Sequence, residues 1–535
     1  MNRVISIFFL LLVVSCANRV TPTGGEKDVT PPKLIEVIPV DGTTSFRDKS
    51  IRFVFDELVQ VGDVVQLVVS PPLSQKPTFR VNRNEIVMRL PDSLNQNTTY
   101  SFDFGKLISD VHEGNPLAAF RYAFSTGESL DSLVLSGKVS DAYTKLSVKE
   151  VAMLLYRNPD NLSFADSAVL SRPCDFFARS DDSGRFAFRN LPSGSFFLVA
   201  CSDKNANFRF DDPLNESFGF LNAPVQLPSG DSIPMNISLQ RPADWRILRA
   251  TRLNRHAAVI VFNRPDSAVA FTGLNGAADS PAAAVYSTFR DSLYLYTGSD
   301  SLRVRFQRKG VPADTILIRM IAPSGAKEPE FKLIPQMLNG PASNGPSEPL
   351  SFTMNHPLAR IDSAFRVVED TLPAVAVPAV VTDSVKGEFR IDFTWKEGKT
   401  YRIECSPGLL RDIFGNTNDT VRVRFTVPTA ENTSLLTVRT SGIARTGAGL
   451  LQLVDEKGNL KRSVRMEKDT VFTFRYLSPG ALRVRFIADR DGDGRWSPGD
   501  WKKRLQPETV VFHPDVVQLR ANWENEVLFQ VDVPR

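Results

Sequence analysis

Acidic residues near the carboxyl end of the chain alternate with glycines at a regular spacing. In the segment DRDGDGRWSPGD, acids stand at loop positions 1, 3, 5 and 12, as Asp489, Asp491, Asp493 and Asp500, and Gly494 stands at position 6. Alternate carboxylates in such a loop converge on one point, and the glycine permits a sharp turn. With the main-chain carbonyl of Arg495 at position 7, the segment predicts a Ca²⁺ site.

Two features depart from the helix–loop–helix form of that motif. Position 12 is aspartate where glutamate is usual, and the pattern before the loop favours a strand. The alternative is an Asx-rich turn whose carboxylates accept hydrogen bonds from backbone N–H groups. A related segment at residues 203–212 lacks the glycine and some of the charge, so calcium is the weaker reading there. If Ca²⁺ binds, we expect it to stiffen a loop and not to catalyse a reaction.

Catalytic motifs are missing from the sequence. It contains no GxSxG, HExxH or phosphate-binding glycine loop. The four histidines, which fall in separate predicted domains, are His112, His256, His356 and His513. The five tryptophans favour buried or hairpin positions, with a glycan-stacking platform as the alternative; they are Trp245, Trp395, Trp496, Trp501 and Trp523. We therefore expect a protein that is not an enzyme.

The amino terminus has the order of a secretory signal that ends at a cysteine. Asn2-Arg3 precedes an apolar run that is too short to span a bilayer, and Val13-Val14-Ser15-Cys16 follows. This order resembles the lipobox of bacterial lipoproteins. The resemblance implies that residues 1–15 are removed and that Cys16 is acylated, which tethers the protein to a membrane. A soluble secreted protein is the alternative. Residues 16–30 then read as a flexible tether.

The other cysteines are Cys174, Cys201 and Cys405, and three cannot all pair within one chain. In an oxidising compartment, a disulfide between Cys174 and Cys201 is the candidate pairing. Without a CxxC motif or a Cys/His cluster, the sequence gives no support for a zinc site.

Composition limits the partners. Of 535 residues, 64 are Lys or Arg and 60 are Asp or Glu, which is too even a balance for a nucleic-acid-binding protein. A hydrophobic fraction of 42% is enough for packed cores. No later apolar run is long enough to cross a bilayer, so the predicted membrane contact is the lipid at Cys16 alone.

Short alternating segments predict β-strands almost throughout. Examples are residues 51–55, 85–90, 99–104 and 121–124, which are separated by turn residues. The predicted fold class is all-β: a string of antiparallel sandwiches behind a signal peptide and a tether. The predicted domains are residues 31–128, 131–240, 241–335, 350–428 and 433–535.

Residues 31–128 carry further signatures, among them PPKLIEVIPVDGTTSF, IRFVFDELV and NQNTTYSFDFG. They resemble the bacterial Ig-like domain of the SbsA type, and the pattern Cys16, Gly24-Gly25, Lys27-Asp28, Pro31-Pro32 resembles lipoproteins of Bacteroidota. The run DDSGRFAFRNLPSGSFFLVACSD resembles the transthyretin-like or carboxypeptidase-regulatory-like fold. These resemblances imply sandwiches of both kinds.

The chain also repeats itself. Six residues recur at a shift of 301, namely Thr99, Tyr100, Gly114, Asn115, Arg121 and Phe124 as Thr400, Tyr401, Gly415, Asn416, Arg422 and Phe425. Others, among them Phe186, Phe188, Leu191, Gly194 and Asp203, recur at a shift of 286. Duplication of a two-domain unit explains both shifts better than chance alternation of phenylalanine does.

These features predict a non-enzymatic outer-membrane lipoprotein that serves as a structural or accessory docking scaffold of the cell envelope. The expected partner is another envelope protein, for example an outer-membrane barrel or its assembly machinery. The alternative is a surface lipoprotein that binds glycan or peptide with the help of Ca²⁺. Residues 17–20 lack the acidic cluster that resembles a surface-export signal, which favours the periplasmic face.

Overall fold

A computed structural model describes most of the chain after the predicted tether. The described residues are 28–91, 93–117, 120–163, 169–170, 172–204, 216–228, 232–239, 246–263, 270–273, 282–287, 291–308, 311–321, 332–336, 346, 348–443 and 447–532. The predicted signal peptide and lipidation site at Cys16 lie outside them, so acylation remains a prediction. None of the described residues forms a helix long and apolar enough to cross a membrane.

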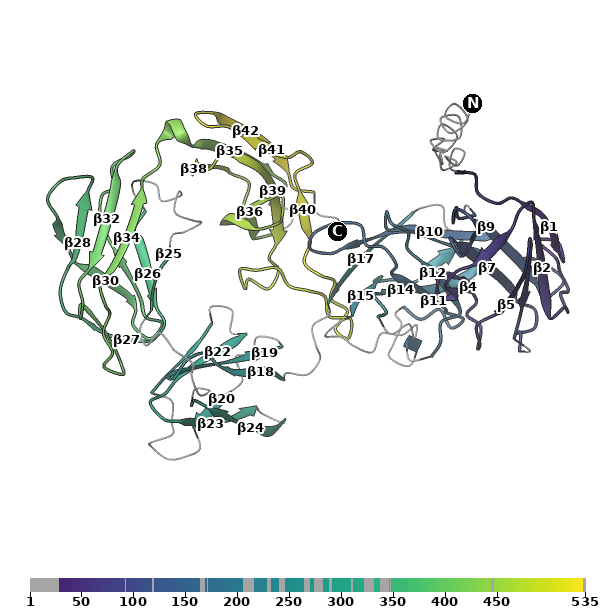
Figure 1. The fold of residues 1–535 in the computed structure, drawn as a ribbon, viewed down its shortest axis with the longest axis horizontal. Helices are drawn as coiled ribbons and strands as arrows, with labels where there is room; N and C mark the ends of the chain where they lie inside the picture. The colour runs from purple at the N-terminus through teal and green to yellow at the C-terminus, as the bar shows by residue number, and fades with distance from the viewer. Residues whose placement is uncertain are drawn as a thin grey trace, which may run out of the picture. The chain divides into compact units, whose positions relative to one another are not determined.

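The described chain divides into two compact units. The first contains the described residues up to Lys138, together with 149–199 and 223–233. The second contains residues 139–148, 200–222 and the described residues from Pro234 onward. Strands make up nearly all of the regular structure (Figure 1), which confirms the all-β prediction.

The first sandwich opens the first unit. Its elements are β1 (Leu34–Ile38), β2 (Ser50–Phe55), β3 (Val59–Val61), the 3₁₀ turn η1 (Val64–Gln66), β4 (Val68–Ser70), β5 (Thr78–Asn82), β6 (Glu85–Arg89), β7 (Thr99–Gly105), β8 (Ile108–Asp110) and β9 (Phe120–Ser125). The sheets run β1-β2-β6-β5, β4-β7-β9 and β3-β8. Ile51, Phe53 and Phe55 on β2 are buried. This is the alternation that the sequence predicted.

Residues 133–239 supply the next eight strands, and the boundary between the units passes through them. They are β10 (Leu133–Asp141), β11 (Ala152–Arg157), β12 (Phe176–Arg179), β13 (Arg185–Leu191), β14 (Gly194–Cys201), β15 (Ser217–Phe220), β16 (Val225–Leu227) and β17 (Ile233–Leu239). Within the first unit β10 pairs with β13, β11 with β12, and β14 with β16. Within the second unit β15 pairs with β17.

Two sandwiches follow in the second unit. The third has β18 (Ile247–Arg252), β19 (Ala257–Phe262), β20 (Ala270–Gly273), β21 (Ala283–Tyr286), β22 (Ser292–Tyr296), β23 (Ser301–Arg308) and β24 (Val311–Arg319). The fourth has β25 (Leu333–Gln336), β26 (Leu350–Met354), β27 (Leu358–Ile361), β28 (Phe365–Glu369), β29 (Val375–Val377), β30 (Ala379–Asp383), β31 (Glu388–Ile391), β32 (Thr400–Cys405), β33 (Leu410–Asp412) and β34 (Val421–Thr426). Trp395 is fully buried in the core of the fourth sandwich, so it is no part of an exposed glycan platform.

The last sandwich carries the acidic loop. After the 3₁₀ turn η2 (Ala430–Asn432), its strands are β35 (Ser434–Ser441), β36 (Gly449–Asp455), β37 (Leu460–Met466), β38 (Val471–Leu477), β39 (Gly480–Ala488), β40 (Val510–Phe512), β41 (Val517–Leu519) and β42 (Glu524–Gln530). One sheet runs β38-β35-β42, with β35 and β42 parallel, and the other β37-β36-β39-β40, with β41 on β39. The acidic loop lies in the segment that connects β39 to β40.

Residues related by the sequence repeat occupy equivalent backbone positions. Tyr100 pairs with Phe124 across β7 and β9, and Tyr401 pairs with Phe425 across β32 and β34. Gly194 has φ +144° and Gly480 has φ +143°, a region that L side chains rarely adopt. These glycines face Leu227 and Leu519, respectively, across the next strand. The agreement in register is what duplication of one two-domain unit would produce.

Candidate functional site

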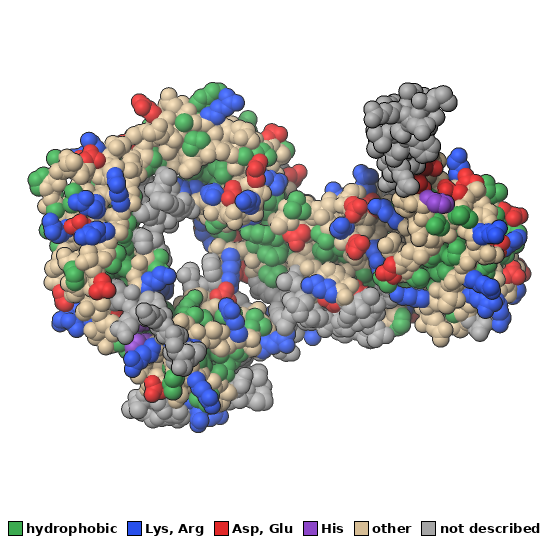
Figure 2. Space-filling view, in the orientation of Figure 1, with side chains coloured by type: hydrophobic (Ala, Val, Ile, Leu, Met, Phe, Trp, Pro, Cys, Tyr) green, Lys and Arg blue, Asp and Glu red, His purple; other side chains and the backbone are tan. Residues whose placement is uncertain are grey.

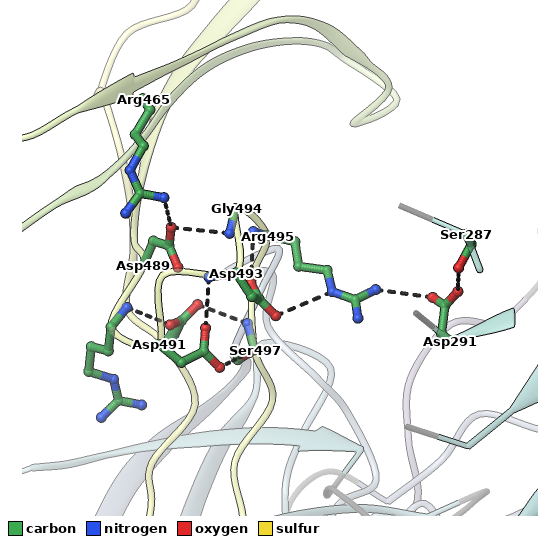
Figure 3. A network of polar contacts seen from close by, with 11 residues as sticks. Ser287, Asp291, Arg465, Asp489, Asp491, Asp493, Gly494, Arg495 and Ser497 are labelled. Carbon is green, nitrogen blue, oxygen red and sulfur yellow. Dashed lines mark hydrogen bonds and ion pairs between the residues drawn. The ribbon is translucent and has the colours of Figure 1, made fainter. Parts of the chain in front are cut away.

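Three of the predicted calcium ligands converge in the loop after β39. One carboxylate oxygen from each of Asp489, Asp491 and Asp493 lies within 4.8 Å of the others. Figure 3 shows the three side chains gathered within the loop. Gly492 and Gly494 have φ of +74° and +78°, and these left-handed positions let the backbone turn between the acids.

Asp489 is the innermost of the three. Its side chain is completely buried, and its Oδ2 accepts hydrogen bonds from Arg465 Nη1 at 2.8 Å and from Gly494 N at 3.2 Å. Its Oδ1 is also buried and has no hydrogen-bond partner among the described residues. A buried carboxylate oxygen without a partner is costly, because it has lost water and gained nothing in exchange.

The other two acids are exposed and are held by the loop itself. Asp491 accepts from Ser497 Oγ at 2.8 Å and from Asp493 N at 3.3 Å. Asp493 accepts from Arg495 N at 2.9 Å and lies 3.3 Å from Arg495 Nε. These Asx-type contacts are those of the alternative interpretation, so they do not by themselves indicate a metal.

Asp500 does not belong to this cluster, contrary to the sequence prediction. Its backbone forms a bridge with Leu505, and its carboxylate accepts from Lys503 N at 3.2 Å and lies 3.7 Å from Lys503 Nζ. The turn at residues 501–504 and this bridge give position 12 a partner of its own. The side chain of Arg495 forms ion pairs with Asp493 and with Asp291, the latter at 3.0 Å (Figure 3).

Glu508 is a structural anchor of the loop that the sequence analysis missed. It is buried, and its two carboxylate oxygens accept from Arg490 N at 2.7 Å and Ser497 N at 2.9 Å. Burial, followed by the nearby charge of Asp491, raises the pKa of Glu508 above its ordinary value, although the two backbone N–H groups act in the opposite direction. The repeat could not reveal it, because Glu216, the buried glutamate before β15, is 292 residues from Glu508 and falls outside the shift of 286.

The predicted disulfide between Cys174 and Cys201 is wrong in this structure. Both residues, like Cys405, are buried free thiols. Cys201 Sγ lies 3.8 Å from Glu216 Oε2 instead. Burial raises the pKa of the Cys174 and Cys405 thiols to about 12, so neither is a ready nucleophile.

Two of the histidines, which the sequence analysis placed in separate domains, meet in the second unit. The rings of His256 and His356 are 5.6 Å apart, and both pack on Phe414. His356 Nδ1 lies 2.7 Å from Asp412 Oδ2, with both side chains buried. Bonds from His356 and Asn416 outweigh the burial of Asp412, and its pKa lies below the ordinary value. His356 and Asp412 thus form a buried pair beside Phe414.

A polar cleft lies within the first unit. It has a volume of about 790 Å³ and is lined by residues of β4, β7, β9, β10, β12 and β13. Phe177 N on β12 donates to Ser70 Oγ on β4 at 3.1 Å, which joins the two walls. Five cations and three acids line it: Arg121, Lys138, Arg179, Arg185, Arg189, Asp41, Asp103 and Asp181.

The acids of this cleft already have partners. Asp103 pairs with Arg121 at 2.7 Å, and Asp181 accepts from the backbone N–H groups of Ser183 and Arg185. Among the described residues, Lys138, Arg185 and Arg189 form no ion pair. Arg179 Nε is buried without a hydrogen-bond partner there. The cleft therefore presents unpaired positive charge, although Figure 2 shows Lys/Arg and Asp/Glu mixed over the visible surface.

Comparison with known proteins supports the first domain. Residues 28–126 match the family model described as "Bacterial Ig-like domain". This agrees with the resemblance seen in the sequence for residues 31–128 and covers a fifth of the chain. No curated protein matches.

Similar solved structures include surface proteins. The S-layer protein SbsC (residues 31–844) is 11% identical over 86% of this chain and 65% of its own, with a TM-score of 0.15, so the chain spans less than two-thirds of it. The Bacillus anthracis TIE protein is 9% identical over 99% of this chain and 78% of its own, at 0.15. BcpA, the major pilin subunit of Bacillus cereus, is 12% identical over 75% and 99%, at 0.13. At these TM-scores the likeness supports no inference about function.

Proposed function

We propose that this chain is a lipid-anchored, non-enzymatic protein of the outer membrane that docks another envelope protein. Three features support the proposal: the lipobox-like order that ends at Cys16, the bacterial Ig-like domain at residues 28–126, and the succession of β-sandwiches. Chains of small sandwiches offer large rigid surfaces while their loops stay free to vary. The single acyl-bearing cysteine would fix the amino end at the membrane.

The observation that carries the docking proposal is the cleft of the first unit. Its free cations and the buried, unpartnered Arg179 Nε suit a carboxylate, because a guanidinium binds carboxylate oxygens through directed N–H donors. We therefore assign it an acidic segment of a partner protein. Such a segment would satisfy Arg179 and neutralise Arg185 and Arg189 on the opposite strand.

Co-purification of a partner protein from mild detergent tests the docking proposal. Variants with reversed charge inside the cleft are compared with one whose charge is reversed outside it. We expect Arg185→Glu with Arg189→Glu to lose the partner, since both side chains are exposed and neither supports the core. Arg80→Glu on β5, an exposed arginine that does not line the cleft, is the matched control and should retain the partner. Equal retention in both variants would rule out the cleft as the docking site.

Intact mass of the mature protein tests the anchor separately. The expected mass corresponds to a chain that begins at Cys16 and carries fatty acids. A Cys16→Ala variant should leave the membrane fraction. A mature chain without acyl groups would contradict the lipid anchor while leaving the docking proposal standing.

A surface lipoprotein that binds glycan or peptide with Ca²⁺ is the second candidate. The acidic cluster of the last sandwich favours it. Glycan binding that disappears on chelation, with no protein partner recovered, would support this second candidate over docking.

A further inference from the structure

We propose that Asp489, Asp491 and Asp493 bind one Ca²⁺ ion and that this ion closes the loop between β39 and β40. The proposal is independent of the lipid anchor and of the cleft. It would give the last sandwich a site whose occupancy follows the calcium concentration outside the cytoplasm.

The unpartnered oxygen of Asp489 is the decisive feature. Asp489 is only 4% exposed, and one of its two oxygens has a full set of donors while the other has none. Leaving such an acceptor unsatisfied costs about 1–3 kcal/mol. Because carboxylate oxygens of two further acids converge with it, a cation would satisfy Asp489 Oδ1 and relieve the repulsion among the three charges.

The donor set points to a hard cation. All three side chains offer carboxylate oxygens, and the cluster contains no cysteine or histidine, which disfavours zinc. Calcium accepts six to eight oxygens in flexible geometry, which three carboxylates, a main-chain carbonyl and water can supply. Magnesium demands a near-ideal octahedron and is the less suited ion.

Two arginines already neutralise part of the negative charge of the three aspartates. Arg465 reaches Asp489 from β37 at 2.8 Å, and Arg495 lies beside Asp493. They contact Asp489 Oδ2 and Asp493 Oδ2, which leaves Asp489 Oδ1 without a hydrogen-bond partner among the described residues. Their positive charge lowers the affinity, and we expect a dissociation constant of about 10⁻⁴–10⁻³ M, the range of extracellular calcium modules.

Binding would stiffen a defined segment. The loop is already fixed at its base, since Glu508 accepts from Arg490 N and Ser497 N, and Trp496 Nε1 donates to the Glu508 carbonyl at 2.8 Å. The turn at residues 491–494 is linked to Asp489 by one backbone hydrogen bond from Gly494 N at 3.2 Å. A cation that joins the carboxylates of Asp491 and Asp493 to the buried Asp489 would therefore add a stronger link between the exposed tip and the sheet.

Calorimetric titration of the chelator-treated mature protein with CaCl₂ tests the proposal. We expect saturable binding of one ion, with affinity reduced at least about tenfold by Asp491→Asn or Asp493→Asn, since each loses a charged ligand. Both side chains are exposed, so neither substitution removes a core contact.

The matched control is Asp455→Asn. Asp455 closes an Asx turn in the same sandwich, accepting from Lys457 N and Asn459 N, and lies outside the cluster. It should bind Ca²⁺ as the parent protein does. Absence of saturable binding by the parent protein up to about 10 mM, a concentration tenfold above the weakest expected constant, would overturn the proposal, and so would equal binding by all three variants.

Discussion

The loops that follow β14 and β39 begin and end alike but differ in the middle. Each has an aspartate just beyond the buried end of the strand, Asp203 two residues after Cys201 and Asp489 directly after Ala488, and each returns to a buried glutamate. Lys204 N donates to Glu216 Oε1 at 3.2 Å, and Arg490 N donates to Glu508 Oε1 at 2.7 Å. Glu216 and Glu508 are 1% and 2% exposed.

Between those anchors the two sequences diverge. The last sandwich has Asp491-Gly492-Asp493-Gly494, whereas the earlier copy has Asn205-Ala206-Asn207-Phe208, which lies outside the described residues. The buried glutamate is therefore part of the shared fold, and the acidic turn is a local addition to one copy. The buried glutamate therefore stabilises both loops, whereas the acidic turn that would bind a cation is present in the last sandwich and not in the earlier copy.

Replacing either buried glutamate tests whether Glu216 and Glu508 stabilise their loops in the same way. We expect Glu508→Ala to lower the free energy of local opening by about 2–3 kcal/mol, because two backbone N–H groups lose a charged acceptor. Glu216→Ala should cost at least about 1–2 kcal/mol, since Lys204 N loses its charged acceptor. Amide hydrogen exchange at residues 204, 490 and 497 measures both. An unchanged rate at 204 in Glu216→Ala would break the equivalence.

Grafting the acidic turn tests whether the middle of the loop alone decides binding. Asn205→Asp, Ala206→Gly, Asn207→Asp and Phe208→Gly together place the last loop's acids after Asp203. We expect the calorimetric stoichiometry to rise from one calcium ion to two. At a hundredfold excess over the dissociation constant, the new ion would stabilise its loop by about 2.7 kcal/mol. A stoichiometry that stays at one would show that Arg465 or another distant residue is also needed.

Replacing Arg465 separates the arginine from the acids. The Arg465 side chain is partly exposed but Asp489 is buried, so Arg465→Gln leaves a buried carboxylate without its charged partner and should destabilise the calcium-free protein by about 1–3 kcal/mol. Loss of a competing positive charge should strengthen Ca²⁺ binding about fivefold. Calorimetry with CaCl₂ gives the ratio directly, and weaker binding in this variant would mean that Arg465 orients Asp489 and does not compete with the ion.

The smallest effect concerns pH. Burial, with the charge of Asp491, raises the pKa of Glu508 above 4.5, so its contribution to stability is greatest below pH 4.5 and is lost as the pH rises through the folded-state pKa. Without calcium, loop protection should therefore fall as the pH rises from 4.5 through the folded-state pKa, relative to Glu508→Gln. Hydrogen exchange of both proteins across that range checks the sign, and a parallel profile would contradict the shift.

Local patterns predicted much of this molecule. Alternation placed Ile51, Phe53 and Phe55 on one face of β2, and spacing alone brought Asp489, Asp491 and Asp493 together, because both are consequences of nearby residues.

The parts of the site that the sequence did not predict depend on contacts between residues distant in sequence. Arg465 reaches the loop through the register β37-β36-β39, and Glu508 returns from beyond it. Asp500 is drawn away by its bridge to Leu505. Free Cys174 and Cys201 likewise followed from packing, which spacing does not reveal.

Hydrogen exchange of the mature chain with and without Ca²⁺ compares the two loops in a single experiment. The account predicts slower exchange within residues 489–500 on adding the ion, and no change in the segment around Lys204. Protection of neither loop, or equal protection of both, would contradict the claim that the acidic turn alone makes one copy a cation site.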